Sequence, residues 1–146
     1  MKLLMISIAL FLSTFSTTAF AKDGEVSPVV LKSFQSQFNA ATEASWTVSQ
    51  NFYKVQFVLN NQHVVAFYSN DGSMIAITRN ITSVQLPVTL QAELKKDYEQ
   101  FWISDLFEIN NEEGTSYYVT LENADMKVVL KGSTFNSWST YQKTKK

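Results

Sequence analysis

The side chains that most often carry out chemistry are scarce in this sequence. It contains one histidine, His63, and no cysteine, so neither a Cys–His pair nor a zinc site built on two such ligands can form. His63 follows Asn60-Asn61 closely, and no motif typical of a serine nucleophile accompanies it. We interpret His63 as a polar residue near the end of a hairpin. The sequence therefore predicts a protein that is not an enzyme, with no catalytic residues, no metal site and no cofactor.

Acidic residues leave one alternative open. Glu93 and Asp97 are four residues apart in a predicted helix, where they share one face beside two lysines, as on a solvated helix surface. Glu112-Glu113-Gly114 and Asn70-Asp71-Gly72 are turns whose oxygens could bind calcium weakly. Neither turn has the alternating acidic ligands and the terminal glutamate of an EF-hand loop. Ordinary turn chemistry explains the same residues, and a calcium-responsive site stays an alternative.

The first 21 residues have the pattern of a signal peptide. Lys2 gives a positive start, an apolar run extends from Leu3 to Leu12, and Ala19-Phe20-Ala21 is a small-x-small cleavage pattern. The run is too short to span a membrane as a helix, which needs about 20 residues. We expect cleavage after Ala21, a mature chain of residues 22–146 without stable membrane insertion, and a periplasmic or secreted location.

Charge excludes one class of partner. The sequence has 12 basic and 13 acidic residues, and removing Lys2 with the signal peptide leaves 11 minus 13, a net charge of −2. Binding to a phosphate backbone needs clustered lysine and arginine side chains. The sequence therefore predicts no nucleic-acid partner.

The stretch 52–77 predicts three antiparallel strands joined by two tight turns. Apolar and polar residues alternate along it, the period-two pattern of a strand with one buried face. Asn60-Asn61 and Asn70-Asp71-Gly72 supply residues that tolerate positive φ, as such turns require. The first turn fixes the expected cross-strand pairs Phe57–Val64, Val55–Ala66 and Tyr53–Tyr68.

The same unit is predicted twice. Ser27-Pro28 begins a helix, as N-cap and first helical position, and Pro87 opens a second helix at Leu86-Pro87. The apolar positions of the two units recur at offsets of 60, 61 and 64 residues. The matched pairs are Val30–Leu90, Phe34–Leu94, Phe38–Tyr98, Trp46–Phe107, Val48–Ile109, Tyr53–Tyr117, Val55–Val119, Phe57–Leu121 and Met74–Trp138. We interpret residues 28–82 and 87–142 as tandem repeats of a helix followed by four antiparallel strands.

Two such units predict an α+β fold. The apolar face of each strand set must be covered, and the preceding helix carries a matching apolar stripe. We expect one eight-stranded antiparallel sheet with both helices on one face and the other face open to water. Phe34, Trp46 and Phe57 are predicted core residues.

These features together resemble one known family. The export signal, the repeated helix-plus-four-strand unit, the hairpin sequence Phe67-Tyr68-Ser69-Asn70-Asp71-Gly72-Ser73 and the Leu86-Pro87 helix start are similar to the exported bacterial PepSY-like family, which is related in fold to the beta-lactamase inhibitor protein. The resemblance covers nearly the whole mature chain. It implies a small periplasmic binding module without assigned chemistry. It carries over no inhibitor activity, because no residue here matches an inhibitor's contact.

The open face supplies the candidate binding site. If Tyr53, Val55 and Phe57 point at the helix, alternation sends their neighbours the other way. The predicted binding residues are Phe52, Lys54, Gln56, Val65, Phe67 and Tyr118, and their surroundings in the second unit include Thr120, Val129 and Lys131. Aromatic anchors within a polar rim are typical of protein-binding surfaces. Loops, the N-terminal segment or a second copy could instead cover Phe52 and Phe67.

The function predicted from the sequence is a non-catalytic binding module. Its partner would be a protein or an envelope ligand held on the open sheet face. The alternative is a periplasmic sensor that responds to a small ligand or to calcium.

Overall fold

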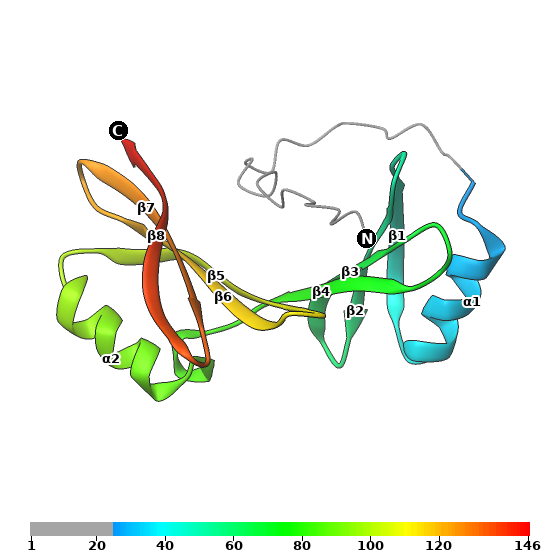
Figure 1. The fold of residues 1–146 in the computed structure, drawn as a ribbon, viewed down its shortest axis with the longest axis horizontal. Coiled ribbons are helices and arrows are strands. Elements are labelled where there is room, and N and C mark those ends of the chain that lie inside the picture. Colours follow the sequence, from blue (N-terminus) through cyan, green and yellow to red (C-terminus); the bar gives the residue numbers. More distant parts are fainter. Residues whose placement is uncertain (1–24) are drawn as a thin grey trace.

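The computed structural model describes residues 25–146; the predicted signal peptide and its cleavage site lie outside these residues. Eight strands form one antiparallel sheet in the order β1 to β8, with two α-helices and one short 3-10 helix, η1 (Figure 1). The fold is therefore α+β. The elements are α1 (Pro28–Gln37), β1 (Thr42–Val48), β2 (Tyr53–Leu59), β3 (Gln62–Tyr68), β4 (Met74–Asn80), η1 (Ser83–Gln85), α2 (Val88–Asp97), β5 (Trp102–Asn111), β6 (Gly114–Glu122), β7 (Met126–Ser133) and β8 (Asn136–Lys145).

The turns of the first half have the predicted conformations. Asn60 and Asn61 adopt φ values of 51° and 61°, and Gly72 adopts 87°, a region that glycine and asparagine tolerate best. The β2–β3 turn fixes the register, and the three predicted cross-strand pairs are confirmed. The side chain of Asp71 closes the β3–β4 turn by accepting hydrogen bonds from the Ser69 hydroxyl and from the backbone N–H of Ser73 at 2.9 Å.

The two helices begin differently. Ser27 is the N-cap of α1 and Pro28 its first residue, as predicted, although the Ser27 side chain makes no capping hydrogen bond. Pro87 is the N-cap of α2, and the helix begins at Val88. The prediction that both prolines open their helices in the same way is therefore wrong by one position. Proline fits both positions because its fixed φ suits the start of a helix and its missing N–H is not needed there.

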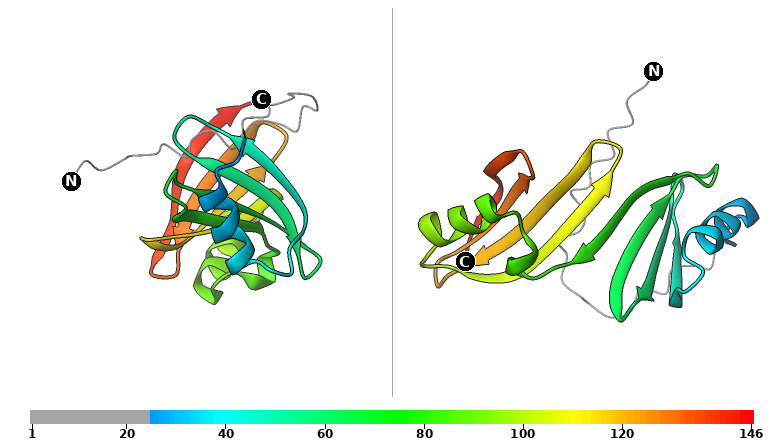
Figure 2. Two further views of the ribbon diagram at one scale, coloured as in Figure 1. Left: turned by 90° about the vertical axis from the view of Figure 1, so that its right-hand side faces the viewer. Right: turned by 90° about the horizontal axis from the view of Figure 1, so that it is seen from below.

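Two separate apolar cores form on the same face of the sheet. In the first half, Val30 and Phe34 of α1 pack against strands β2 and β3; in the second, Leu90 and Leu94 of α2 pack against β5, β6 and β7. Strand alternation, followed across the ladder from Val55 through β4 and β5, places both contact surfaces on one side. Figure 2 shows the two helices near opposite ends of the sheet. Of the predicted core residues, Phe34 and Phe57 are buried, and Trp46 is partly buried against the same cluster.

The strand register corrects one predicted correspondence. The β1–β2 register shifts between Thr42 and Ser45, and the β5–β6 register shifts between Ile103 and Asp105. Beyond the bulge in β5, the residues that face α2 are even-numbered, and Leu106 pairs with buried Val119. Phe107 and Ile109 therefore point away from the helix and do not correspond to Trp46 and Val48. Both halves carry this bulge at the same place, so the 60-residue spacing that relates Val30 to Leu90 continues through β5 and puts Leu106 at the position of Trp46.

Candidate functional site

The sheet face opposite the helices holds the predicted binding residues. Gln56 pairs with Val65 and Lys54 pairs with Phe67, on the positions that alternate with buried Val55 and Phe57. The two strands β2 and β3 therefore position four of the predicted side chains next to one another. Gln56 is exposed, and the other three are partly exposed.

Phe52 and Phe67 form a ring pair on this face. Phe52 lies just before β2, and its ring centroid is 6.0 Å from that of Phe67 at an interplanar angle of 58°. Lys54 lies opposite Phe67, and partial burial lowers the pKa of the Lys54 ammonium below its ordinary value. A cation held partly out of water beside aromatic rings interacts more strongly with an incoming partner than one in bulk water.

Tyr118 is the centre of a second aromatic cluster that the sequence revealed only in part. Its ring stacks on that of Phe107, with 5.3 Å between the ring centroids and an interplanar angle of 7°. The Tyr141 ring meets it edge-on, with 5.4 Å between the centroids and an angle of 87°. The ammonium of Lys131 lies 5.7 Å from the Tyr118 ring centroid. Phe107 lies on this face because the β5–β6 turn pairs it with Tyr118, although the sequence had matched it to Trp46. Tyr141 is the extra residue at a register shift between β7 and β8, which sequence reasoning did not detect.

Two residues near Tyr118 are not available for binding. Thr120 and Val129 are each only 2% exposed, although both lie on the face opposite the helices. They occupy β6 and β7, and each is flanked by paired strands on both sides. The accessible part of the second half is therefore the Phe107–Tyr118–Tyr141 cluster with Lys131, and not the whole face.

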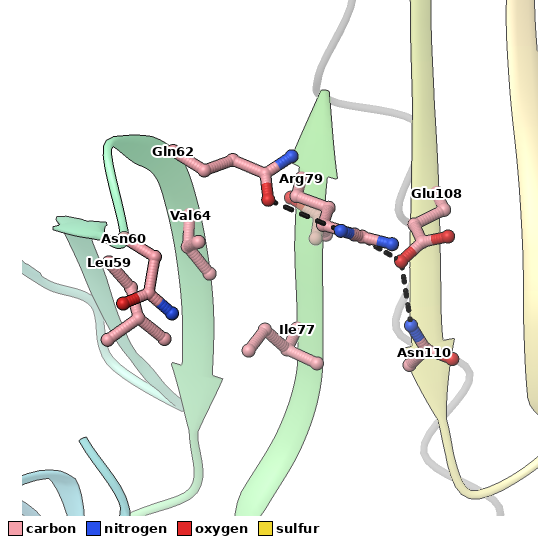
Figure 3. A pocket seen from close by; sticks show the side chains of 9 residues that line it. Leu59, Asn60, Gln62, Val64, Ile77, Arg79, Glu108 and Asn110 are labelled. Atoms are coloured by element: carbon pink, nitrogen blue, oxygen red, sulfur yellow. Dashed lines mark hydrogen bonds and ion pairs between the residues drawn. The ribbon is translucent and has the colours of Figure 1, made fainter. Parts of the chain in front are cut away.

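The helix side of the sheet has a hollow between the two cores. It measures about 330 Å³ and is lined by strands β2 to β5 (Figure 3). Apolar Leu59, Val64 and Ile77 alternate in its lining with polar Asn60, Gln62, Arg79, Glu108 and Asn110. It lies where β4 pairs with β5, at the junction of the two halves.

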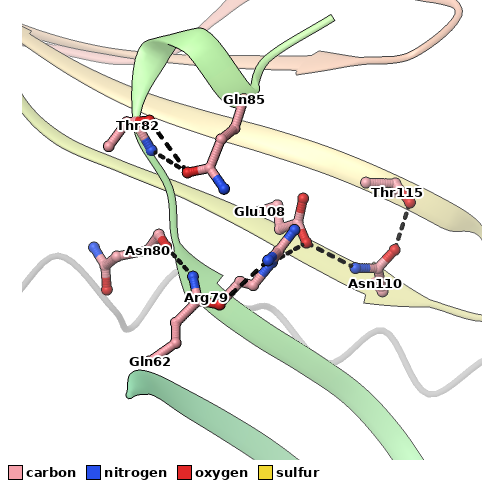
Figure 4. Close-up of polar contacts among 8 residues, drawn as sticks. All are labelled: Gln62, Arg79, Asn80, Thr82, Gln85, Glu108, Asn110 and Thr115. Atoms are coloured by element: carbon pink, nitrogen blue, oxygen red, sulfur yellow. Dashed lines mark hydrogen bonds and ion pairs between the residues drawn. The ribbon is translucent and has the colours of Figure 1, made fainter. Parts of the chain in front are cut away.

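An ion pair crosses that junction. Arg79 Nε donates to Glu108 Oε1 at 2.5 Å, and Arg79 Nη1 donates to Gln62 Oε1 at 3.2 Å (Figure 4). The bond to Glu108 raises the pKa of the Arg79 guanidinium above its ordinary value. Arg79 and Glu108 are direct cross-strand partners, and such pairs stabilise the ladder that carries them.

The other candidate residues do not assemble into a site. His63 is exposed, and Asp71 is used within its own turn. Glu93 is not simply solvated, as the sequence suggested, because its carboxylate accepts a hydrogen bond at 3.1 Å from the backbone N–H of Trp138. Residues 25–146 contain no group of three histidine, cysteine, aspartate or glutamate side chains placed to hold a metal ion. Within the same residues, no helix is long and apolar enough to cross a membrane.

Comparison with known proteins shows the fold. No family model and no curated protein matches the chain. Solved structures that resemble it include a provisionally described periplasmic protein from Bacteroides eggerthii, with a TM-score of 0.72 and 12% identity over 84% of this chain and 90% of that chain. A BLIP-like protein from Bacteroides fragilis has a TM-score of 0.69 and 16% identity, and the match covers 84% of this chain and 87% of that chain. A DUF2874 family protein from Bacteroides uniformis has a TM-score of 0.71 and 10% identity, and the match covers 83% of this chain and 90% of that chain. At these identities the likeness establishes that the chain has a BLIP-like fold.

Proposed function

We propose that this protein is an exported, non-catalytic binding module that holds a protein or envelope ligand on the uncovered face of its sheet. The observation that carries the proposal is the presence of two ring clusters on that face, Phe52–Phe67 and Phe107–Tyr118–Tyr141. Lys54 and Lys131 stand beside them as polar neighbours. Partly exposed aromatic rings with charged groups at the rim are the composition of protein-binding surfaces.

The proposal includes export and a repeated architecture. Cleavage after Ala21 would release residues 22–146 to the periplasm or the medium, as the sequence pattern predicts. Two observations support a tandem duplication of residues 28–82 and 87–142. The helices α1 and α2 have 10 residues each, and each half has a bulge near the start of its first strand. A relationship to the PepSY-like family is part of the same proposal.

The ligand face can be tested by photocrosslinking in living cells. A photoreactive phenylalanine analogue at Gln56, the exposed residue at the middle of the first-half site, should give an adduct of defined mass. The same analogue at Gln35, exposed on α1, is the matched control and should give none. Phe67→Ser should reduce the Gln56 adduct, corresponding to a loss of at least ~1 kcal/mol of binding free energy.

The design separates loss of binding from loss of folding. Thermal unfolding of Phe67→Ser should stay within a few degrees of the parent protein, because Phe67 lies outside both buried clusters. Equal adducts from Gln56 and Gln35, or none from Gln56, would refute the ligand face. Unfolding of Phe67→Ser would show that this ring is structural.

A second candidate function is a small-ligand sensor, and the hollow between the two cores favours it. Arg79 and Glu108 present opposite charges beside Leu59 and Ile77, which suits a small molecule that has polar and apolar parts. A thermal-shift screen of small metabolites and of calcium tests this candidate. Stabilisation that Arg79→Met abolishes would favour it over the sheet-face proposal.

A further inference from the structure

The last hairpin of the sheet has a positive charge that contrasts with the rest of the chain. Residues 126–146, which include β7 and β8, hold five lysines and no acidic residue, a net charge of +5. Residues 22–125 hold six basic and 13 acidic residues, a net charge of −7. The five lysines are Lys127, Lys131, Lys143, Lys145 and Lys146. Such a separation of charge makes this end of the sheet attract acidic groups.

The same hairpin provides a free edge of the sheet. β8 is the last strand in the sheet order, and none of residues 25–146 pairs with its outer edge (Figure 1). The backbone N–H of Lys146 donates to the Asp125 carbonyl oxygen at 2.9 Å, and the pairing with β7 is regular from Gln142 to Lys145. By alternation, Lys143 and Lys145 therefore direct their backbone N–H and C=O groups away from β7. Such unpaired groups are a template for a further strand.

Lysine side chains flank this edge on both faces of the sheet. Lys143 pairs with Val128, which is buried in the core under α2, so Lys143 and Lys145 lie on the helix face. Both side chains are exposed. Lys127 and Lys131 lie one strand further in on the opposite face, and both are partly exposed. A strand added at this edge would thus lie between two pairs of lysines.

We propose that the outer edge of β8 binds an extended acidic segment of a partner protein, which joins the sheet as a ninth strand. The backbone of Lys143 and Lys145 would hold the added strand, and its carboxylates would lie opposite the side chains of these two residues. The same lysines select the partner, because a second copy of the chain paired through β8 would bring like charges to the edge.

The edge arrangement favours a peptide strand over an anionic membrane. A flat lipid surface meets one face of the sheet at a time, and each face has only two of the four flanking lysines. Electrostatic membrane binding relies on larger clusters, of about four to eight basic residues. The proposed contact lies at the edge of the sheet and does not rest on the function proposed for the open face.

Hydrogen exchange, followed by NMR on the exported protein, tests the proposal. The probe is a peptide of about eight residues, blocked at both ends, in which glutamate alternates with threonine. The same peptide with glutamine in place of glutamate is the matched control. We expect the glutamate peptide to slow exchange of the N–H groups of Lys143 and Lys145. The N–H groups of Gln142 and Thr144 should change little, because they already bond to β7.

Charge reversal separates a contact at the edge from an effect of net charge. Lys143→Glu should raise the dissociation constant of the glutamate peptide about 5-fold or more, because it places like charges opposite each other. Lys32→Glu, at an exposed position of α1, changes the net charge by the same amount and should have a much smaller effect, since screening weakens distant charges. Both lysines are exposed, so the fold should stay intact, and thermal unfolding of each variant checks this.

Three outcomes would overturn the proposal. They are unchanged exchange at Lys143 and Lys145 in saturating peptide, equal binding of the glutamate and glutamine peptides, and equal effects of the two charge reversals. Vesicles that contain phosphatidylglycerol are the second arm. Vesicle binding that Lys143→Glu weakens, without peptide binding, would assign these lysines to an anionic lipid surface instead. None of these measurements involves the open face, so a negative result leaves the function proposed there standing.

Discussion

The two halves of the sheet have the same elements but fill their cores with different side chains. In the first half the core is aromatic: the Phe34 ring lies 5.1 Å from Phe57 and 5.3 Å from Trp46, both nearly edge-on. In the second half leucines predominate, with Leu90 and Leu94 packed against the strands. The comparison teaches that one arrangement of a helix on four strands accepts either chemistry, provided that the apolar volume is filled.

The halves also anchor their second hairpin to the helix from different strands. In the first half Tyr68 of β3 donates its hydroxyl to Gln37 Oε1 of α1 at 2.7 Å. At the 64-residue spacing that relates Val55 to Val119, the position of Tyr68 corresponds to Gly132 and that of Met74 to Trp138. In the second half the large aromatic side chain is therefore on β8, and the glycine on β7 makes room for it. The large Trp138 side chain is thus accommodated by the absence of a side chain at Gly132.

The largest expected effect contrasts the two cores at corresponding positions. Phe57→Ala should lower the free energy of unfolding by about 4 kcal/mol and Leu121→Ala by about 3 kcal/mol. Both side chains are 2% exposed, and the phenylalanine additionally loses its ring contacts with Phe34 and Phe38. Chemical denaturation measures both variants. A larger loss for Leu121→Ala would mean that the aromatic core is not the more strongly packed one.

An intermediate effect is expected at Gly132 and tests whether this glycine makes room for the Trp138 ring on β8. Gly132→Ala should cost about 2 kcal/mol, because the added methyl group overlaps the Trp138 ring. Adding Trp138→Leu should recover part of this loss, since it removes the overlapping ring. Gly72→Ala is the contrasting variant in the first half. It combines a φ of +87° with a Cβ only 3.1 Å from the Val29 carbonyl oxygen, and no side-chain change relieves either.

Thermal and chemical unfolding of the double variant decide this prediction. If Gly132→Ala with Trp138→Leu is no more stable than Gly132→Ala alone, the glycine is not there to accommodate the indole ring.

The smallest expected effect concerns the Tyr68 hydroxyl. Tyr68→Phe should cost about 1 kcal/mol at neutral pH, the usual value of one hydrogen bond. Burial raises the pKa of Tyr68 to about 12, above the value of about 10 in an unfolded chain. Between these values the folded protein keeps a proton that the unfolded chain has lost, so stability should fall as the pH rises from 10 to 12. Unfolding measured across this range should show a smaller fall for Tyr68→Phe, and an unchanged slope would contradict the assignment.

The fold was largely predictable because its signals are local. Asn60-Asn61 and Gly72 specify turns through their own backbone preferences, and alternation then fixes the register and the facing of β2 and β3. The sheet, its antiparallel pairing and the two helices followed from these rules. The start of α2 was placed one residue early, because proline suits both the N-cap and the first helical position.

The second half of the candidate site was less predictable because two strand registers were not recognised. Phe107 had been matched to Trp46 although the β5–β6 turn pairs it with Tyr118, and the extra residue at Tyr141 in β8 leaves no mark in a pattern of apolar residues. The hydrogen bond between Glu93 and Trp138 was not predictable either, because it joins residues 45 positions apart and has no local sequence signal. Lys131 beside Tyr118 was recoverable, because both follow from simple alternation.

The bare strip between the two cores has a consequence for how a ligand is held. Among residues 25–146 no helix packs on the sheet where β4 meets β5, and the ladder and the Arg79–Glu108 pair join the halves there. The curvature of the sheet along this strip sets the distance between the Phe67 and Tyr118 clusters on the opposite face. A ligand that touches both clusters is attached at two points, and its second attachment is strengthened by the effective concentration that this distance creates. If the proposed ligand touches both clusters, its length must therefore match the separation that this strip of the sheet sets.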